Sequence, residues 1–171
     1  INKIQSNHGG QRMDPNEMFI FEPKTGKLLW RFNRPARGCI AGNEAGTIKS
    51  DGRYRTVFVL GKRLYVHRIV WEMHYGGIPE GLCIDHIDGN GLNNKLHNLR
   101  VTTLSGNQRN KRLQKSNKTG IPGVFITKSG YLVSCAQKRI KHTQDFFEVC
   151  CLRKAAELLH GFHKNNGRNI A

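Results

Sequence analysis

The chain has 171 residues, enough for one ordinary domain or two small ones, and its hydrophobic content of 37% suits two modest cores better than one large core. The 28 Lys and Arg residues against 12 Asp and Glu residues give a formal charge of +16, so a polyanion, nucleic acid above all, is the expected partner. Neither a long apolar run nor a basic amphipathic helix is evident in the sequence, so we expect no membrane partner.

The cysteines exclude two classes of small protein. They are odd in number and include no C-x-x-C pair, which argues against a disulfide framework and against a zinc knuckle. We therefore expect reduced thiols in an intracellular protein without a targeting segment. The five are Cys39, Cys83, Cys135, Cys150 and Cys151.

The first part of the chain predicts two pairs of strands. Residues 1–17 are polar and aperiodic, which is typical of a loose terminus. Residues 18–32 place a Pro-Lys-Thr-Gly turn between two apolar runs, which predicts a hairpin. Residues 53–60 and 62–66 predict two further strands around a Gly61-Lys62 turn.

A helix is predicted over residues 67–75, where Ile69, Val70 and Met73 share one face and Gly76-Gly77 follows as a stop. This helix is expected to pack behind the segment that comes next. His67, at its start, is most simply interpreted as a structural residue that supports a site rather than one that does chemistry.

Residues 82–107 carry the strongest functional signal, because an apolar run delivers Asp85 and His86 into a Gly- and Asn-rich loop. His86 can accept a proton from water when a neighbour fixes its tautomer, and Asp85 can ligate a hard divalent cation. Adjacent side chains of a strand point to opposite faces. Both can therefore serve one site only if the strand ends or twists there, and the turn at residues 88–91 supplies that break.

Two asparagines extend this candidate site. Asn98 begins a second strand, where its amide can clamp the loop. Thr102 or Thr103 is a good helix N-cap, which places Asn107 in the first or second helical turn, where its side-chain oxygen can complete a metal site. The alternative interpretation is that the loop is only a turn and that the histidine is a buried partner of the aspartate.

The stretch resembles the HNH endonucleases, in particular phage and intron-encoded homing endonucleases, with the pattern D-H-x-D-G-N-x-x-x-N, then N-L-R-x-x-T, then a helical Asn. Residues 66–71 also fit. The resemblance implies an α+β fold whose first part is a ββα-metal (His-Me finger) nuclease module at 18–114, with its core motif at 82–110. The residues on the pattern are Asp85, His86, Asp88, Gly89, Asn90, Asn94, Asn98, Leu99, Arg100, Thr103 and Asn107.

The resemblance also implies roles for these residues. His86 would be the general base, Asp85 and Asn107 would hold one Mg²⁺ or Mn²⁺ per active site, and Asn98 would fix the loop. The residues expected to support them are His67, Asn90 and Asn94. The implied reaction is phosphodiester hydrolysis to 5′-phosphate and 3′-hydroxyl ends, without a small-molecule cofactor.

The third motif position holds Asn where other members have His, which resembles members that nick one strand. Whether the protein nicks or cuts both strands stays open, and so does the choice between monomer and dimer. The resemblance to phage enzymes makes the cytoplasm of a phage-infected bacterium the expected setting.

The centre of the chain is basic throughout, because no acidic residue occurs between Asp88 and Asp145. Residues 108–118 are typical of a helix end that runs into a basic linker, placed at 115–120, which can follow a DNA groove or simply be solvated. The residues expected to contact DNA in this part are Arg100, Arg109, Lys111, Arg112 and Lys115.

Residues 121–171 predict a second module of three short strands, at 123–127, 131–137 and 138–147, followed by a helix at 148–164. The apolar face expected for this helix consists of Cys151, Ala155, Leu158, Leu159 and Phe162. The order resembles the plant ethylene-response-factor (Apetala-type) DNA-binding domain, which implies a sheet that reads the major groove of double-stranded DNA. The contacts expected there include Lys128, Tyr131, Lys138, Arg139 and Lys141, with Thr127, Ser134 and Gln137, although only alternate residues of a strand can face DNA.

The sequence thus predicts a metal-dependent, site-selective DNA endonuclease of the homing type. Two alternatives stay open: a DNA-binding regulator with an inactive nuclease module, and a protein that binds structured RNA. The presence of Asp85, His86 and Asn107 argues against the first alternative. Preference for RNA over duplex DNA would favour the second.

Overall fold

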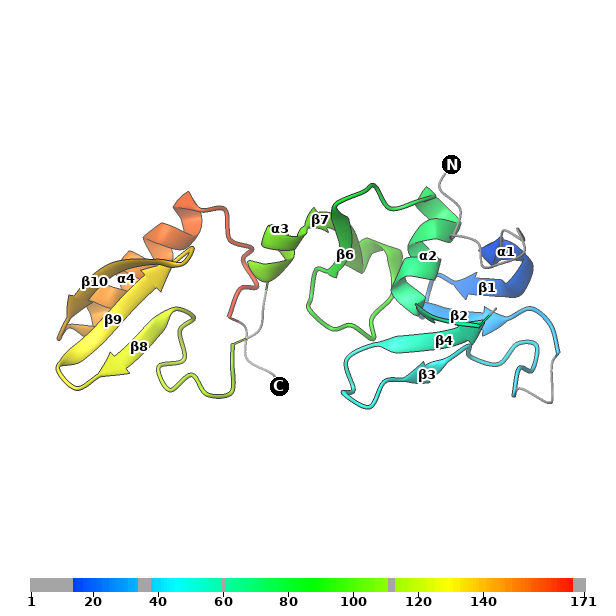
Figure 1. The fold of residues 1–171 in the computed structure, drawn as a ribbon, viewed down its shortest axis with the longest axis horizontal. Helices are drawn as coiled ribbons and strands as arrows, with labels where there is room; N and C mark the ends of the chain where they lie inside the picture. The colour runs from blue at the N-terminus through cyan, green and yellow to red at the C-terminus, as the bar shows by residue number, and fades with distance from the viewer. Residues whose placement is uncertain (1–13, 34–37, 60, 111–112, 168–171) are drawn as a thin grey trace. The chain divides into compact units, whose positions relative to one another are not determined.

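The computed structural model describes residues 14–33, 38–59, 61–110 and 113–167 (Figure 1). The chain divides into two compact units, Ile1–Leu104 and Ser105–Ala171. This division falls at the start of helix α3 (Leu104–Gln108), earlier than the linker predicted at 115–120. None of the helices in the described ranges is long and apolar enough to cross a membrane.

The first unit begins with a helical turn, α1 (Pro15–Met18), and the predicted hairpin, now β1 (Phe19–Glu22) and β2 (Lys27–Trp30). The loose terminus predicted for residues 1–17 is wrong over α1, and its first thirteen residues lie outside the described ranges. The helical turn forms because the Asp14 side chain caps it by accepting a hydrogen bond from the Asn16 N–H, and because proline suits the first helical position.

A three-stranded antiparallel sheet follows, in the order β3 (Thr47–Ile48), β4 (Arg55–Val59) and β5 (Lys62–Tyr65). The predicted strands β4 and β5 are confirmed, but the turn lies earlier than expected because β5 already begins at Lys62. Gly61 adopts φ +74°, a conformation that glycine takes without strain. The sequence analysis did not predict β3, because a strand of two residues is too short to produce an alternating pattern.

Helix α2 (Val66–Tyr75) confirms the predicted helix and buries Val66, His67, Ile69 and Val70. It ends at Gly76, which has φ +79°. The apolar side of α2 packs into the core of the first unit. Side chains from the β1–β2 hairpin, from the three-stranded sheet and from a later hairpin complete this core. The fully or almost fully buried members are Phe19, Leu28, Ala45, Val57, Val66, Ile69 and Val70.

The last hairpin of the first unit consists of β6 (Leu82–His86) and β7 (Leu99–Thr103), which pair in antiparallel fashion. The loop between them ends in a 3₁₀ helix, Leu96–Asn98, so Asn98 precedes β7 instead of beginning it. Ile84 and Leu99 are buried in the common core. The hairpin is therefore anchored to the apolar core of the unit while its loop carries polar side chains.

The second unit is a three-stranded antiparallel sheet, β8 (Val124–Thr127), β9 (Gly130–Cys135) and β10 (Lys138–Thr143), with helix α4 (Phe146–Leu159) packed against it. The three predicted strands and the helix are confirmed. The helix begins earlier than predicted because Asp145 caps it, accepting hydrogen bonds from the N–H groups of Phe147 and Glu148. The helix ends before residue 164, and Gly161, with φ +61°, follows it.

The apolar face predicted for α4 is wrong. Leu158 and Leu159 are 76% and 86% exposed, and the buried residues are Val149, Arg153 and Ala156. Hydrophobic periodicity could not find the buried face, because it treats Arg153 as a polar residue. An arginine can cover an apolar surface with its aliphatic stem when its charged end has partners.

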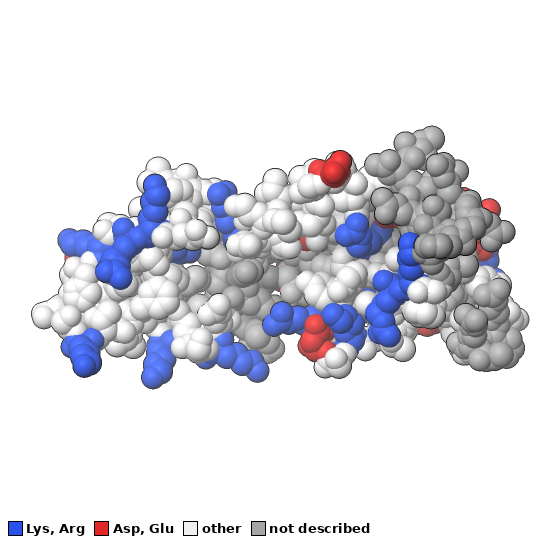
Figure 2. Space-filling model, in the orientation of Figure 1, with Lys and Arg blue, Asp and Glu red and all other residues white. Residues whose placement is uncertain are grey.

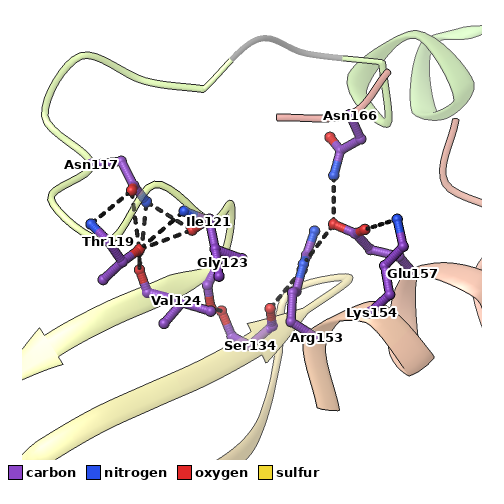
Figure 3. A network of polar contacts seen from close by, with 10 residues as sticks. All are labelled: Asn117, Thr119, Ile121, Gly123, Val124, Ser134, Arg153, Lys154, Glu157 and Asn166. Carbon is purple, nitrogen blue, oxygen red and sulfur yellow. Dashed lines mark hydrogen bonds and ion pairs between the residues drawn. The ribbon is translucent and has the colours of Figure 1, made fainter. Parts of the chain in front are cut away.

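The Arg153 guanidinium has such partners (Figure 3). Its Nη1 donates to the Ser134 carbonyl at 2.7 Å and its Nε to Glu157 Oε1 at 3.0 Å. Glu157 Oε1 also accepts from Asn166 Nδ2 at 2.9 Å, and the Phe162 ring lies 4.9 Å from the guanidinium carbon. The network joins α4, the sheet and the segment after α4.

The segment before β8 is an ordered turn where the sequence predicted a linker (Figure 3). Asn117 Oδ1 accepts from the N–H groups of Thr119 and Gly120, and its Nδ2 donates to the Ile121 carbonyl at 2.9 Å. The Thr119 hydroxyl donates to the Val124 carbonyl at 3.0 Å. These bonds tie the turn to the first strand of the sheet.

Candidate functional site

His86 is the last residue of β6 and is only 4% exposed. Its Nε2 lies 3.1 Å from Oδ1 of Asn94, a residue that is itself 3% exposed. An amide oxygen can only accept a hydrogen bond, so this contact requires the proton on Nε2 and leaves the lone pair of the neutral ring on Nδ1. The loop thus fixes the tautomer of His86.

Burial lowers the pKa of His86 below its ordinary value. The hydrogen bond to Asn94 and the nearby carboxylates of Asp88 and Asp85 act in the opposite direction but do not cancel the effect of burial. The imidazole is therefore neutral at neutral pH, which is the state in which it can accept a proton.

Asp85 is 6% exposed and lies directly opposite Arg100 in the hairpin. Arg100 donates to Asp85 Oδ2 from Nε at 3.0 Å and from Nη2 at 2.8 Å. Two charge-assisted bonds on one oxygen hold the carboxylate in a fixed orientation. Arg100, predicted as a DNA contact, is bonded to Asp85 here, although about a third of its side chain stays exposed, 31% by area.

Asn98 closes the loop through a reciprocal pair of hydrogen bonds with Asp88. The Asp88 N–H donates to Asn98 Oδ1 at 3.0 Å, and Asn98 Nδ2 donates back to Asp88 Oδ1 at 2.9 Å. Asn98 Nδ2 also donates to the Asn93 carbonyl at 2.8 Å. The side chain that was predicted to clamp the loop therefore bonds to two points along it.

Asp88 lies at the centre of the hydrogen bonds within this loop, a role that the sequence analysis did not assign to it. Burial raises its pKa, but hydrogen bonds from Asn93 Nδ2, the Asn90 N–H and Asn98 Nδ2 outweigh that effect, and the net pKa is lowered. The position of Asp88 in the motif was the available signal. Asn90, predicted as a supporting residue, also accepts from the Leu92 N–H at 3.1 Å.

His67 lies beside His86, with their ring centroids 5.0 Å apart. The Tyr54 ring is 5.9 Å from His86 and 5.5 Å from His67. His67 was predicted as a supporting residue, whereas Tyr54 was missed, because it lies well upstream of the motif and belongs to no pattern in the sequence. The contact of Tyr54 with His86 depends on how the segment before β4 packs against the last hairpin of the unit.

Asn107 lies on helix α3, which follows β7 directly, and is half-buried. It belongs to the second compact unit and Asp85 to the first, so a metal site shared by the two stays a prediction. In the described ranges no cluster of three or more His, Cys, Asp and Glu side chains is arranged to hold a metal. The predicted ligand pair, one carboxylate and one amide, would not form such a cluster.

The two faces of the second sheet differ in what they contact. Val133 and Cys135 of β9 are buried, so the alternate residues Leu132 and Ser134 lie on the open face, away from α4. Arg139 pairs with Ser134 and therefore shares the open face.

Several other residues predicted to contact DNA lie on the helix side of this sheet or outside its strands. Tyr131 packs on the Phe146 ring of α4 at 5.0 Å, and Lys141 forms an ion pair with Glu148 of α4. Lys138 pairs with the buried Cys135 and so lies on the helix side. Lys128 is exposed in the turn between β8 and β9, Lys115 is exposed, and the Arg109 guanidinium carbon lies 5.8 Å from the Phe162 ring. Lys111 and Arg112 lie outside the described residues.

Basic side chains outnumber acidic ones on the visible surface. Figure 2 shows Lys and Arg side chains spread over one face with few acidic side chains among them. This distribution agrees with the formal charge of +16. A surface of this sign attracts phosphate backbones from a distance.

One comparison with known proteins falls on the segment that carries this site. The family model described as HNH endonuclease matches residues 64–109, which run from strand β5 through helix α3. Protein 3.8 of Escherichia phage T7 is 36% identical over 101 residues, which cover 56% of this chain and 84% of that protein.

Two further similarities cover a smaller share of the matched protein. The uncharacterized HNH endonuclease L560 of Acanthamoeba polyphaga mimivirus is 37% identical over 90 residues, 52% of this chain and 46% of that protein. A solved structure titled "DNA binding and cleavage by the HNH homing endonuclease I-HmuI" is 32% identical, with a TM-score of 0.36, and covers 52% of this chain and 48% of that chain. This chain thus spans less than half of both proteins.

Proposed function

Because this chain belongs to the HNH endonuclease family, we propose that it is a metal-dependent, site-selective DNA endonuclease of the homing type that nicks one strand of double-stranded DNA. The products are a 5′-phosphate and a 3′-hydroxyl. The observation that carries the proposal is His86, a buried and neutral imidazole whose tautomer is fixed by Asn94, next to Asp85 in the motif.

His86 acts as the general base in this proposal. Nε2 keeps its proton because it donates to Asn94, so Nδ1 is the atom that takes the proton from the attacking water. A positioned general base contributes roughly a hundredfold to ten-thousandfold to a reaction rate. When His86 becomes protonated, the carboxylates of Asp88 and Asp85 favour the positive charge on the ring.

The donor atoms fit a hard divalent cation, because the Asp85 carboxylate and the Asn107 amide offer oxygen and no thiolate takes part. Asp85 would hold Mg²⁺ or Mn²⁺, one per active site, and Asn107 is the second ligand that the motif predicts. Such a cation, when bound, stabilises the negative charge that builds on the phosphate and on the departing oxygen. Arg100 orients the Asp85 carboxylate through its two hydrogen bonds to Oδ2.

The loop between β6 and β7 supports both groups. Asn98 and Asp88 bond to each other twice, and Asn90 and Asn93 complete the set around the Asp88 carboxylate. The loop therefore keeps one shape with Asn94 directed at His86. A site built this way needs little rearrangement before reaction, which supports catalysis by preorganised groups.

Double-stranded DNA is the proposed partner, bound mainly through its phosphates by the basic surface. In the second unit we assign contacts to the open face of the sheet, with Arg139 as the basic residue on it, and to Lys128 at its edge. A single active site suits a monomer that nicks an asymmetric target. The phage relative supports action in the cytoplasm of a phage-infected bacterium.

The test is cleavage of supercoiled plasmid carrying phage or host DNA, with Mg²⁺, with Mn²⁺ and with chelator, by the wild type and by His86→Ala. We expect open circles that require both the metal and His86, with at least a hundredfold slower nicking by the variant. Linear product would contradict nicking and indicate paired active sites. Absence of cleavage under every metal, with DNA binding intact, would leave a DNA-binding protein, and preferential binding of RNA would overturn the choice of DNA.

A further inference from the structure

Three aromatic side chains pack together beside His86 and form what we call the aromatic wall: Tyr54, Tyr65 and His67. Within the wall the ring centroids lie 5.6 Å apart for Tyr54 and Tyr65, 5.5 Å for Tyr54 and His67, and 5.3 Å for Tyr65 and His67. Each ring therefore touches both of the others. Contacts at these distances, tilted or edge to face, are favourable aromatic pairs.

Two members of the wall contact His86 itself. The His67 ring meets the His86 ring at 5.0 Å and 82°, an edge-to-face arrangement, and Tyr54 lies at 5.9 Å and 44°. Tyr65 packs on the rings of these two residues. The wall thus has a layer against His86 and a support behind it.

The wall is held by different elements of the first unit. Tyr65 ends β5, His67 lies in the first turn of α2, and Tyr54 directly precedes β4. The loop after His86 closes on Tyr54 as well, because a Cβ added at Gly91 would lie 2.6 Å from the Tyr54 ring and 2.2 Å from the Arg53 carbonyl. The position of the wall is therefore set by the sheet, the helix and the loop together.

His67 acts in this wall as an uncharged ring. Burial lowers its pKa to about 3, with smaller contributions from the neighbouring charges of His86 and Arg68. Its Nδ1 is buried and has no hydrogen-bond partner in the described part of the chain. A buried polar atom without a partner destabilises a fold, so a phenyl ring in this place should be tolerated or favoured.

Asn94 alone does not fix the orientation of His86. The hydrogen bond to Asn94 restrains the Nε2 corner of the imidazole, whereas the position of Nδ1 also depends on the tilt of the ring plane. Contacts along the flank of the ring act on this tilt. The position of Nδ1 matters because general-base catalysis depends on the distance and direction to the proton that is taken.

We propose that the aromatic wall positions the His86 imidazole: His67 and Tyr54 fix the plane of the ring, and Tyr65 holds them in place. The three are positioning residues and none takes part in proton transfer. This inference rests on the proposed function, since it assigns the orientation of the group that acts as its base. It also concerns a property of the free protein that can be measured without any substrate.

The test compares three substitutions in the full chain: His67→Ala, which removes the ring; His67→Phe, which keeps a ring without titratable nitrogen; and His74→Ala as the matched control. His74 lies on the same helix and makes a similar edge-to-face pair, with Phe21 at 5.0 Å and 77°. Tyr54→Leu is the second variant of the wall. Plasmid nicking gives kcat and KM, thermal unfolding gives Tm, and nitrogen-15 NMR reports the His86 ring in the free protein.

We expect His67→Ala and Tyr54→Leu to lower kcat by roughly ten- to a hundredfold with little change in KM. His67→Phe should restore kcat to within about threefold of the wild type, with an equal or higher Tm, because the unpaired nitrogen is gone. His74→Ala should keep the wild-type kcat. In the NMR spectra His86 should show one Nε2–H tautomer in the wild type and in His67→Phe, and averaged or broadened signals in His67→Ala.

Two outcomes would overturn the inference. If His67→Phe lost as much kcat as His67→Ala, His67 would act through its nitrogens rather than as a ring. If the His86 signals were unchanged in both His67→Ala and Tyr54→Leu, the wall would not orient that ring. The NMR arm separates this inference from the proposed function, because an inactive wild type would sink the endonuclease while the spectra would still decide on the wall.

Discussion

Each of the two units buries polar side chains, but the surroundings of these side chains differ. Among the described residues of the first unit, four of the buried polar side chains gather in one hairpin and its loop, beside a core of twelve buried apolar residues; the four are Asp85, His86, Asn94 and Asn98. In the second unit the buried polar residue of α4 is Arg153, which lies within a network that joins the helix to the sheet. The apolar core described for this unit is smaller, with three buried valines and a few partly buried side chains packed against them.

The difference indicates what each set contributes. The first unit has an apolar core large enough to fold around a group of polar side chains, so that group is available for chemistry. The second unit has little apolar core, and the bonds of Arg153 take over part of the work of packing. Substitution of a buried polar residue should therefore mainly affect activity in the first unit and stability in the second.

The largest expected effect is in the second unit, with Arg153→Met. Loss of the guanidinium leaves the Ser134 carbonyl and part of the Glu157 carboxylate without their partner, which should cost about 3–5 kcal/mol of unfolding free energy. Both tryptophans, Trp30 and Trp71, lie in the first unit. Far-ultraviolet circular dichroism should therefore show early loss of part of the helix and sheet signal, while tryptophan fluorescence keeps its wild-type transition.

Lys154→Met is the control for this prediction. Lys154 lies 3.7 Å from the same Glu157 carboxylate, but its side chain is 69% exposed, so its loss should cost less than about 1 kcal/mol. Equal destabilisation by the two variants would contradict the structural role given to Arg153. A shift of the fluorescence transition in Arg153→Met would contradict the assignment of its effect to the second unit.

The contrast between the units also shows how far sequence reasoning reaches. The close placement of Asp85, His86 and Asn98 could be predicted because they occur within one hairpin, where spacing along the chain nearly determines position in space. The ion pair of Asp85 with Arg100 depends on the register of β6 and β7, and the contact of Tyr54 with His86 depends on tertiary packing. Neither leaves a pattern in the sequence.

The face of α4 was mispredicted for a related reason. Hydrophobic periodicity counts Arg153 as polar, so the spacing of Val149, Arg153 and Ala156 was not recognised as the buried face. The strands and the helix themselves were found, because turn residues and apolar runs mark them locally. Whether an amphipathic side chain such as that of Arg153 is buried depends on partners that only the folded chain brings near it.

The second prediction concerns the pH dependence of the first unit. In the unfolded chain His67 binds a proton below about pH 6.5, whereas in the folded chain its pKa is about 3. Between these values the unfolded state binds more protons, so stability is lost as the pH falls, by up to about 1.4 kcal/mol per pH unit. Urea unfolding followed by tryptophan fluorescence at pH 7 and pH 5 measures this loss.

His67→Phe should remove most of that loss. A smaller dependence of the same sign should persist in the variant, because burial also lowers the pKa of His86. An unchanged pH dependence in His67→Phe would show that His67 is not the buried neutral group described above. The second unit has no fluorescent tryptophan, so this readout stays specific to the first.

The third prediction tests how closely the second unit is packed around Arg153. Gly123 has φ +70°, and a Cβ there would lie 2.4 Å from the Ser134 carbonyl oxygen and 2.7 Å from Arg153 Nη1. Gly120 has a similar φ of +75° but no atom within 4 Å of its added Cβ. Alanine at either site should cost about 1–2 kcal/mol for the backbone conformation.

Gly123→Ala should therefore be the more destabilising variant, by a further 1–3 kcal/mol or so from overpacking, in thermal unfolding followed by circular dichroism. Similar losses for the two glycines would mean that Arg153 can move aside at little cost. That result would weaken the view that its network substitutes for an apolar core.

The smallest expected effect is a gain in stability in the second unit, from Gln137→Gly in the turn between β9 and β10. Ala136 and Gln137 have φ +49° and +66°, the conformation that a two-residue hairpin turn of this hand requires and that glycine adopts most easily. Relief of this strain, less the entropy that glycine adds to the unfolded chain, should stabilise the unit by about 0.5 kcal/mol.

Gln144→Gly, just beyond the other end of β10, is the matched control. Gln144 is exposed and is not among the described residues with positive φ, so glycine should destabilise the unit or be neutral there. If Gln137→Gly lowered the melting temperature as Gln144→Gly does, side-chain contacts of Gln137 would outweigh backbone strain, and local turn chemistry would contribute less to this small unit than the Arg153 network does.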